Sequence, residues 1–230
     1  GYNNVILHTS GNYFVCIRSD GTTDIFTLPI TVAGDIGTEY DSIDLTNIQS
    51  GGTNLINLGG DTYAYAYQGT AGIGVLCTFI VSSGLMTTLK DSYTFEATSC
   101  IYPRIASVEN DKYAIVYHNT TNNTGKVITL SIDASGTITK SIIDSLNFET
   151  SSTGQESIDI IDTAGNIFTV AYLNKIKTFT IDSVGNIGAA TIDTLQFDSS
   201  ANNVGDPRIL HVIDNIFLVS YSYGSQGNGA

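Results

Sequence analysis

The residues of this sequence best suited to acid-base or metal chemistry are its acids and histidines. The chain of 230 residues contains 22 Asp and Glu residues but only three histidines, His8, His118 and His211. No acid or second histidine lies at metal-ligand spacing beside His8 or His211, so we expect strand or channel positions for these two and a position near a loop for His118. The sequence therefore predicts no metal site and no cofactor.

Many of the acids recur at equivalent positions along the chain. Asp61 corresponds to Asp111, and Asp91 corresponds to Asp144. Acids that repeat in this way usually belong to turns, whereas a catalytic site normally interrupts a repeat. Paired carboxylates for a glycoside hydrolase, or for a lyase, are accordingly the third functional hypothesis. The sequence favours a protein that is not an enzyme.

A ring of polar residues is a second candidate site. One residue of the ring stands nine positions before each of five recurrent aromatic residues, which are Tyr13, Tyr63, Tyr113, Phe168 and Phe217. The ring consists of Asn4, Asn54, Arg104, Asp159 and Arg208. If these residues line a central channel, Arg104 and Arg208 could bind a sugar or a small anion; otherwise the ring side chains pair with one another and with water. A longer turn at residues 162–166 leaves Ser157 as the alternative to Asp159.

Two N-glycosylation sequons lie close together in a polar segment. They begin at Asn119 and Asn122, and the segment ends at Gly125. A loop of this composition is typical of the sites that glycans occupy on secreted proteins. We therefore expect glycosylation at these two positions.

The five aromatic residues also define an internal repeat, because the steps between them are 50, 50, 55 and 49 residues. In the third copy, β-rich segments at 104–108, 113–117 and 126–133 precede a fourth within 137–148, without competing helical periodicity. Four short strands per unit of this length are typical of a β-propeller blade. The repeats cover residues 1–49, 50–99, 100–153, 154–202 and, in part, 203–230. We predict one all-β domain over residues 1–230, a β-propeller of about five four-stranded blades whose last blade is incomplete.

Two further columns of residues support this register. In each full repeat the third strand ends with an isoleucine followed four residues later by a glycine, at Ile30/Gly34, Ile80/Gly84, Ile132/Gly136 and Ile181/Gly185. The fourth strand carries Asp, then Ser or Thr, then an apolar residue, beginning at Asp41, Asp91, Asp144 and Asp193. The second strand alternates large and small side chains, as in residues 63–67, so the bulky face of one sheet should pack on the shallow face of the next.

Three segments of the third repeat point to a known kind of protein. They are residues 103–105 (Pro103, Arg104 and Ile105), 110–117 and 127–133. Together they resemble the blades of repetitive surface β-propellers of archaea and bacteria, of the broad YVTN/NHL-like kind, and similar units cover essentially the whole chain. The YVTN tetrad itself is absent. The resemblance implies a propeller that serves as a scaffold, an adhesin or, occasionally, an enzyme.

Charge and cysteine content restrict the kinds of partner and the cellular location that we expect for this protein. With 22 acidic and 9 basic residues the net charge is −13, which argues against nucleic acid, because phosphate backbones need clustered Lys and Arg. The cysteines, Cys16, Cys77 and Cys100, are odd in number and lack metal-ligand spacing, so we expect no disulfide framework and buried thiols at Cys16 and Cys77. No apolar run approaches the roughly 20 residues that cross a bilayer. Because the chain starts at Gly1, we expect a processed or truncated start. The sequons and the resemblance to surface propellers favour a location outside the cell or at the cell surface.

The last repeat supplies only two of four expected strands. Its second strand, with Phe217, Val219 and Tyr221, would leave an open edge, and open edges recruit partners. We expect self-association or contact with neighbouring propeller domains through this edge, and contact with glycans. The primary hypothesis is a non-enzymatic structural or adhesive module of a cell-surface layer, filament or multi-propeller assembly. The alternative is a lectin-like propeller that binds carbohydrate or a small anion through the ring.

Overall fold

The structure is a computed structural model that describes residues 5–19, 23–45, 48–50, 54–87, 89–150, 158–199 and 204–223. It contains two compact units. The first comprises Gly1–Ile105 and Ser131–Ser141, and the second comprises Ala106–Leu130 and Ile142–Ala230. Each unit is defined by the contacts among its own residues. The prediction of a single domain over residues 1–230 stays a prediction.

Two antiparallel sheets lie in the first unit. The first sheet has the order β1 (Val5–His8), β2 (Tyr13–Ser19), β3 (Thr23–Pro29) and β4 (Asp41–Asp44). The second has the order β6 (Leu55–Gly59), β7 (Thr62–Gly69), β8 (Gly74–Ser82) and β10 (Asp91–Glu96). Two short strands extend it, β5 (Ile48–Ser50) beside β7 and β9 (Leu85–Met86) beside β8, and one turn of 3-10 helix, η1 (Thr70–Gly72), follows β7.

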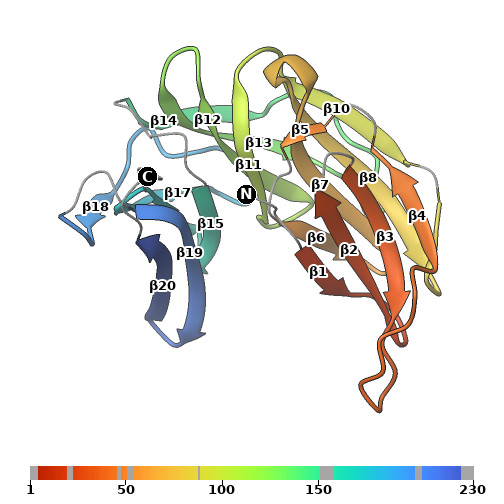
Figure 1. The fold of residues 1–230 in the computed structure, drawn as a ribbon. Helices are drawn as coiled ribbons and strands as arrows, with labels where there is room; N and C mark the ends of the chain where they lie inside the picture. The colour runs from red at the N-terminus through yellow and green to blue at the C-terminus, as the bar shows by residue number, and fades with distance from the viewer. Residues whose placement is uncertain are drawn as a thin grey trace, which may run out of the picture. The chain divides into compact units, whose positions relative to one another are not determined.

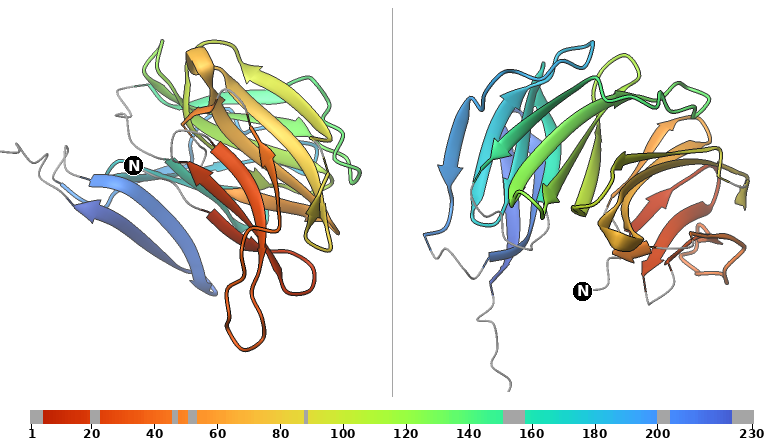
Figure 2. Two further views of the ribbon diagram at one scale, coloured as in Figure 1. Left: turned by 45° about the vertical axis from the view of Figure 1, so that its right-hand side comes forward. Right: turned by 90° about the horizontal axis from the view of Figure 1, so that it is seen from above.

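The remaining sheets repeat this pattern (Figure 1). The third sheet, whose strands belong to both units, has the order β11 (Cys100–Ser107), β12 (Lys112–Asn119), β13 (Thr124–Ser131) and β14 (Asp144–Glu149). The fourth, in the second unit, has the order β15 (Ile158–Ala164), β16 (Ile167–Tyr172), β17 (Lys175–Thr180) and β18 (Asp193–Gln196). The fifth has two strands, β19 (Val204–Ile213) and β20 (Ile216–Tyr223), which form a ribbon beside the fourth sheet (Figure 2).

These sheets confirm the predicted fold class, an all-β propeller of about five blades in which each sheet is one blade. Four sheets are complete antiparallel meanders, and the fifth has two strands among the described residues. The four strands predicted for the third repeat are all present, although the first begins at Cys100 rather than Arg104. Among the described residues, no helix has the length and apolar character needed to cross a membrane.

The core of the first unit shows why the second strands alternate large and small side chains. On β7, Tyr63 and Tyr65 point to one face and Ala64 and Ala66 to the other, and all four are buried. The tyrosines pack with Val15, Ile17, Cys77 and Phe79 in one hydrophobic cluster. Both faces of the strand are therefore removed from water, as the sequence predicts for stacked sheets. Cys16 and Cys77 are buried free thiols, also as predicted, and so is Cys100.

The second unit has an equivalent core around the fourth sheet. Phe168, Val170 and Tyr172 of β16 are buried and pack against Phe148 and Phe179. The ring of Phe148 meets Tyr172 edge-on with centroids 5.3 Å apart, the favoured geometry for an aromatic pair. This core fixes the positions of the hairpin turns at the ends of β11, β15 and β17, where the candidate site lies.

Candidate functional site

A tight turn between β11 and β12 presents Glu109 to solvent. The Lys112 N–H donates to the Glu109 carbonyl at 3.1 Å, and the two central residues, Asn110 and Asp111, have φ values of 51° and 61°. Positive φ at both central positions defines a type I′ turn, which Asn and Asp tolerate better than other non-glycine residues. Glu109 thus stands at the first position of a rigid hairpin turn, with its side chain exposed.

The neighbouring hairpin, between β15 and β16, positions Asp162. Register shifts between Asp162 and Ala164, where the longer fourth repeat forms an irregularity. Gly165 at the turn has a φ of 62°, and the Thr163 hydroxyl donates to the Ile167 carbonyl at 2.8 Å. Asp162 is therefore the last residue before the irregularity, and it lies opposite Phe168, whose ring is buried.

A third turn follows β17 and contains Asp182. Its Oδ1 accepts the N–H groups of Val184 and Asn186 at 3.1 and 2.8 Å, and its Oδ2 accepts the Asn186 side-chain amide at 2.9 Å. These hydrogen bonds, the Asn186 amide foremost, lower the pKa of Asp182. Asp182 therefore remains ionised as a turn residue.

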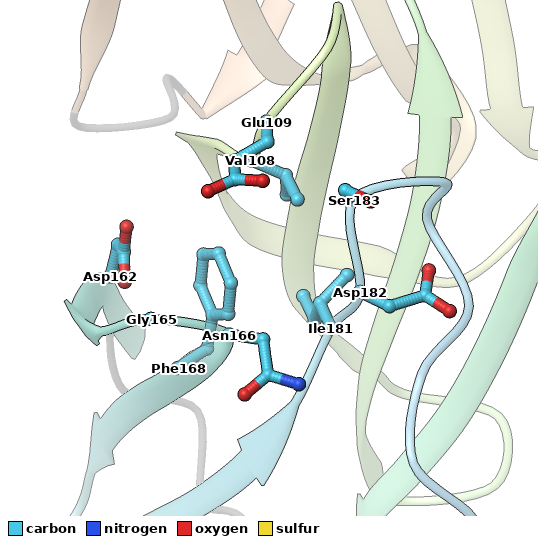
Figure 3. A pocket seen from close by; sticks show the side chains of 9 residues that line it. All are labelled: Val108, Glu109, Asp162, Gly165, Asn166, Phe168, Ile181, Asp182 and Ser183. Atoms are coloured by element: carbon cyan, nitrogen blue, oxygen red, sulfur yellow. The ribbon is translucent and has the colours of Figure 1, made fainter.

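The three turns enclose a cavity of about 360 Å³. Phe168 and Ile181 form its apolar wall, and Glu109, Asp162 and Asp182 contribute carboxylates. Figure 3 shows Glu109 and Asp162 reaching toward the space beside the Phe168 ring, whereas the Asp182 carboxylate points away from them. Partial burial and, second, the negative charge of Glu109 raise the pKa of Asp162. The cavity therefore combines an aspartate that holds its proton more tightly than usual with a second carboxylate nearby.

Two other hollows have a different chemistry. One of about 390 Å³ lies over β1 to β3 and is lined by Ile6, Cys16, Phe26 and other mostly apolar residues, with no carboxylate. The other, of about 420 Å³, has Asp44 as its one acid. Size alone would favour these two, but general acid-base chemistry needs two convergent groups. We therefore take the Glu109/Asp162 cavity as the candidate site.

The structure gives the predicted ring residues a role between consecutive sheets. The Asn54 amide hydrogen-bonds both backbone groups of Ile105: Nδ2 donates to its carbonyl, and Oδ1 accepts its N–H at 3.0 Å. Asp159 Oδ2 accepts the Ile209 N–H at 2.9 Å. Ile105 and Ile209 directly follow Arg104 and Arg208 in the chain. One ring side chain thus binds the backbone beside the next ring residue, in each unit separately.

The two ring arginines lie in different units, Arg104 in the first and Arg208 in the second. Arg104 is buried, and Arg208 is partly buried, which lowers the pKa of its guanidinium. Asn4 and Ser157 lie outside the described residues. Sugar or anion binding by the ring stays a prediction.

Asp159 is expected to destabilise the protein at neutral pH. Burial raises its pKa from the ordinary 3.8 to about 6, although N–H groups of Ile209 and Ile160 oppose the shift. Because the folded-state pKa of Asp159 exceeds its unfolded one, the contribution of Asp159 to stability is greatest below about pH 4 and is lost as pH rises to about 6. Asp159→Asn, which mimics Asn54, should raise the free energy of unfolding at pH 8 by about 2–3 kcal/mol. Urea titrations of both proteins at pH 4.5 and 8 measure this, and identical pH dependence would contradict it.

The histidines act as structural groups. In the first and fifth sheets, Nε2 of His8 and of His211 lies 2.8 Å from a turn carbonyl, that of Gly11 or Asp214. His118 is buried with Nε2 3.0 Å from Asn123 Oδ1, and burial lowers its pKa. Among the residues that the structure describes, no group of three or more His, Cys, Asp or Glu is placed to hold a metal ion.

The two sequon asparagines differ in exposure. The Asn119 side chain is buried and its Oδ1 accepts the Asn122 N–H at 3.1 Å, whereas Asn122 is exposed. Asn122 is therefore the more accessible of the two, and glycosylation stays a prediction for both. On β20, Phe217 and Val219 are half-buried and Tyr221 is 40% exposed, and their role in assembly stays a prediction.

Sequence reasoning missed Glu109 and Asp162 as a pair, yet the repeat carried a signal. The position four residues before the recurrent aromatic residue holds an acid only in the third repeat, where it is Glu109; the other repeats have Thr9, Gly59, Ala164 and Ile213. Asp162 lies in the step of 55 residues, the longest of the four. Glu109 and Asp162, the two acids that converge in this cavity, both break the repeat.

Solved structures share this fold. A putative 6-phosphogluconolactonase from Bacteroides uniformis matches 96% of this chain and 68% of its own, with a TM-score of 0.62 and 12% identity. A GH32 beta-fructofuranosidase from Bombyx mori matches 95% of this chain and 54% of its own, with a TM-score of 0.56 and 12% identity. A mutant of AofleA from Arthrobotrys oligospora matches 98% of this chain and 66% of its own, also at 0.56 and 12%. No family model matches the sequence, and no curated protein does.

These matches correct one expectation from the sequence. The inference that the chain is not an enzyme is wrong, because the solved structures of this fold include a lactonase and a fructofuranosidase by name. The primary hypothesis of a non-enzymatic structural or adhesive module likewise has no support among them. At 12% identity the similarity establishes the propeller fold, and the resemblance to YVTN/NHL-like propellers stays a prediction.

Proposed function

We propose that this chain is a propeller hydrolase that acts on a carbohydrate or a sugar derivative, with Asp162 as proton donor and Glu109 as its partner carboxylate. The observation that carries the proposal is the pair itself: two acids from different hairpins converge on one cavity, and Glu109 raises the pKa of Asp162. Glycoside hydrolysis needs this asymmetry, because one carboxyl must enter the reaction protonated while the other is ionised.

Each residue has a separate part in the proposed reaction. Asp162, whose proton is retained by partial burial and by Glu109, protonates the departing oxygen of the substrate. Glu109, fixed by the type I′ turn, attacks the sugar carbon or activates a water molecule. Phe168 and Ile181, both buried, form the apolar inner wall of the cavity. Asp182 holds its turn and takes no part in proton transfer.

The comparisons are compatible with this proposal without naming the substrate. A lactonase for a phosphorylated sugar acid and a fructofuranosidase are both named for hydrolysis of sugar-derived compounds. The open position of both carboxylates on hairpin turns suits a polymer or an extended oligosaccharide better than an enclosed small molecule. An extracellular location fits such a substrate and remains part of the proposal.

A substrate screen tests the proposal directly. The full chain is incubated with a panel of polysaccharides, oligosaccharides and sugar lactones, and the release of reducing ends or acid is measured. The blank is the double variant Glu109→Gln/Asp162→Asn, and the matched control is Asp44→Asn, an exposed strand carboxylate outside the cavity. We expect hydrolysis by the wild type and by the control but not by the blank. Equal hydrolysis by the blank, or none by the wild type across the panel, would reject the proposal, and unsaturated products would replace the hydrolase with a lyase.

A further inference from the structure

One pair of residues joins each of the first three sheets to the next sheet. A threonine in the third strand and an aspartate at the start of the fourth lie directly opposite each other, as the pairs Thr27/Asp41, Thr78/Asp91 and Thr129/Asp144. The threonine hydroxyl donates, at 2.5–2.6 Å, to the backbone carbonyl of a turn glycine in the next sheet, which is Gly84, Gly136 or Gly185. The aspartate Oδ2 accepts, at 2.8–2.9 Å, the backbone N–H of the residue two positions after that glycine, which is Met86, Ile138 or Ile187. We call this arrangement the Thr-Asp contact.

Each Thr-Asp contact is built into a sheet interface. The three threonines have no exposed surface, and Ile138 and Ile187 are only 2% and 8% exposed. In every case Oδ1 of the aspartate also accepts the N–H of the following residue, at 2.7–2.9 Å. This second bond fixes the carboxylate so that Oδ2 points toward the neighbouring turn. A hydrogen bond from an N–H to such a carboxylate is stronger than one between neutral groups.

The fourth sheet carries the same pair without a turn from the described residues against it. Thr178 of β17 lies opposite Asp193 of β18, and Asp193 Oδ1 accepts the Thr194 N–H at 2.7 Å, as in the other sheets. Yet Asp193 is exposed and Thr178 is only partly buried. Within the described part of the chain, no glycine turn meets these two side chains. The fourth sheet therefore presents a complete, correctly oriented half of a Thr-Asp contact.

In the other sheets such a turn follows a third strand, and the fifth sheet has room for a third strand beside β20. In the four complete sheets the second strand pairs with a third, whereas β20 pairs within the described residues with β19 alone. The fifth sheet is held on the fourth by the Asp159 bond to Ile209, which pairs with Val219. Two residues further along β20, the Tyr221 hydroxyl donates to Asp198 at 3.3 Å and the Tyr221 ring lies 5.1 Å from that of Phe197. β20 is thus held against the fourth sheet, the sheet that carries Thr178 and Asp193.

We propose that the outer edge of β20, together with Thr178 and Asp193, is a docking site for a β-hairpin of the type that forms the third strand and turn of this repeat. The hairpin strand would pair antiparallel with β20, which satisfies its backbone groups. A glycine carbonyl in the turn would accept the Thr178 hydroxyl, and the N–H of an apolar residue two positions later would donate to Asp193. The ligand is therefore a β-hairpin with the pattern apolar, three residues, glycine, one residue, apolar.

The first sheet of a second copy does not supply such a hairpin. Its turn is accessible, with Ile36 73% exposed, but β3 already pairs with β2 on one edge and β4 on the other. A strand paired on both edges has no backbone groups left for β20. The occupant must instead carry a strand with a free edge, which favours a separate hairpin segment.

A peptide of residues 174–196, which contains β17, its turn and β18, serves as the probe because its turn fits the third sheet in this structure. Binding of the labelled peptide to the full chain is measured by fluorescence anisotropy, and hydrogen exchange reports protection of β20 amides. The variant Thr178→Val/Asp193→Asn is compared with Thr94→Val/Asp44→Asn, the same changes at exposed strand positions. A peptide with Ile187→Pro lacks the N–H that Asp193 would accept.

We expect the peptide to bind the wild type and the control equally, with protection of β20, and to bind the Thr178/Asp193 variant roughly tenfold more weakly or worse. The Ile187→Pro peptide should lose affinity to a similar extent. Absence of binding at millimolar peptide, or binding that the Thr178/Asp193 variant and the proline peptide leave unchanged, would overturn the proposal. Sedimentation of the chain alone tests whether a second copy occupies the site. If the wild type is a dimer and the Thr178/Asp193 variant is a monomer, the occupant is a second copy and the separate hairpin is rejected.

Discussion

Asp162→Asn is expected to slow hydrolysis of a sugar substrate about 10³-fold, because an amide cannot protonate the departing oxygen. Partial burial and the Glu109 charge keep the proton on Asp162 to a higher pH than usual, so the wild-type rate should fall as pH rises through that raised pKa. The variant should lose this descending limb of its pH profile. Steady-state rates between pH 4 and 9 measure both effects.

Glu109→Gln separates the two roles. It removes the nucleophile or base and should cost about 10³-fold or more in rate. It also removes the negative charge that helps to raise the pKa of Asp162, so the descending limb of the residual activity should move to lower pH. A substrate with a good leaving group, such as a nitrophenyl glycoside, needs no proton donor and should restore Asp162→Asn much more than Glu109→Gln. Equal restoration of the two variants, or a limb that stays in place in Glu109→Gln, would contradict the assigned roles.

The strands were predictable because stacked sheets impose a pattern on residues close together in the chain. Tyr63 to Tyr67 alternate in size because both faces of β7 are covered, and the column of aspartates at 41, 91, 144 and 193 recurs because each fourth strand holds the same bond to its own next residue. Such constraints repeat with the fold and are visible as a period. The bonds from each Thr-Asp pair to the next sheet join residues 43–58 positions apart, which no local pattern reveals.

The candidate site was not predictable in the same way. Glu109 and Asp162 belong to different repeats, and only the packing of the third sheet on the fourth brings their turns around one cavity. The pKa of Asp162 depends on its partial burial and on the charge of Glu109. Neither can be inferred from the residues next to Asp162 in the sequence. Function was harder still, because one propeller fold serves scaffolds and enzymes alike. The repeated acids pointed to turns, correctly for Asp111, and thereby drew attention away from Glu109 and Asp162, which do not repeat.

Glu149→Gln is expected to lower the free energy of unfolding of the second unit by about 3 kcal/mol. Glu149, at the end of β14, is buried, and its Oε2 accepts the Tyr172 hydroxyl at 2.7 Å. The same oxygen lies 3.2 Å from Lys175 Nζ and 3.4 Å from Lys177 Nζ. The glutamine would leave two ammonium groups without their negative charge, and the Lys177 side chain is only 14% exposed. Chemical denaturation followed by tyrosine fluorescence measures the loss.

Two further variants test whether this loss of stability comes from the buried charges rather than from the position of Glu149 in its strand. Glu96 ends β10 as Glu149 ends β14, and the Oε1 of each accepts the N–H of the next residue, that of Ala97 at 3.0 Å and that of Thr150 at 2.9 Å. Because Glu96 is more exposed, Glu96→Gln should cost less than about 1 kcal/mol. Lys177→Met removes one of the ammonium groups, so Glu149→Gln/Lys177→Met should cost clearly less than the two single changes together. Strict additivity, or an equal loss in Glu96→Gln, would show that Glu149 acts through its backbone position and not as the common acceptor of Tyr172, Lys175 and Lys177.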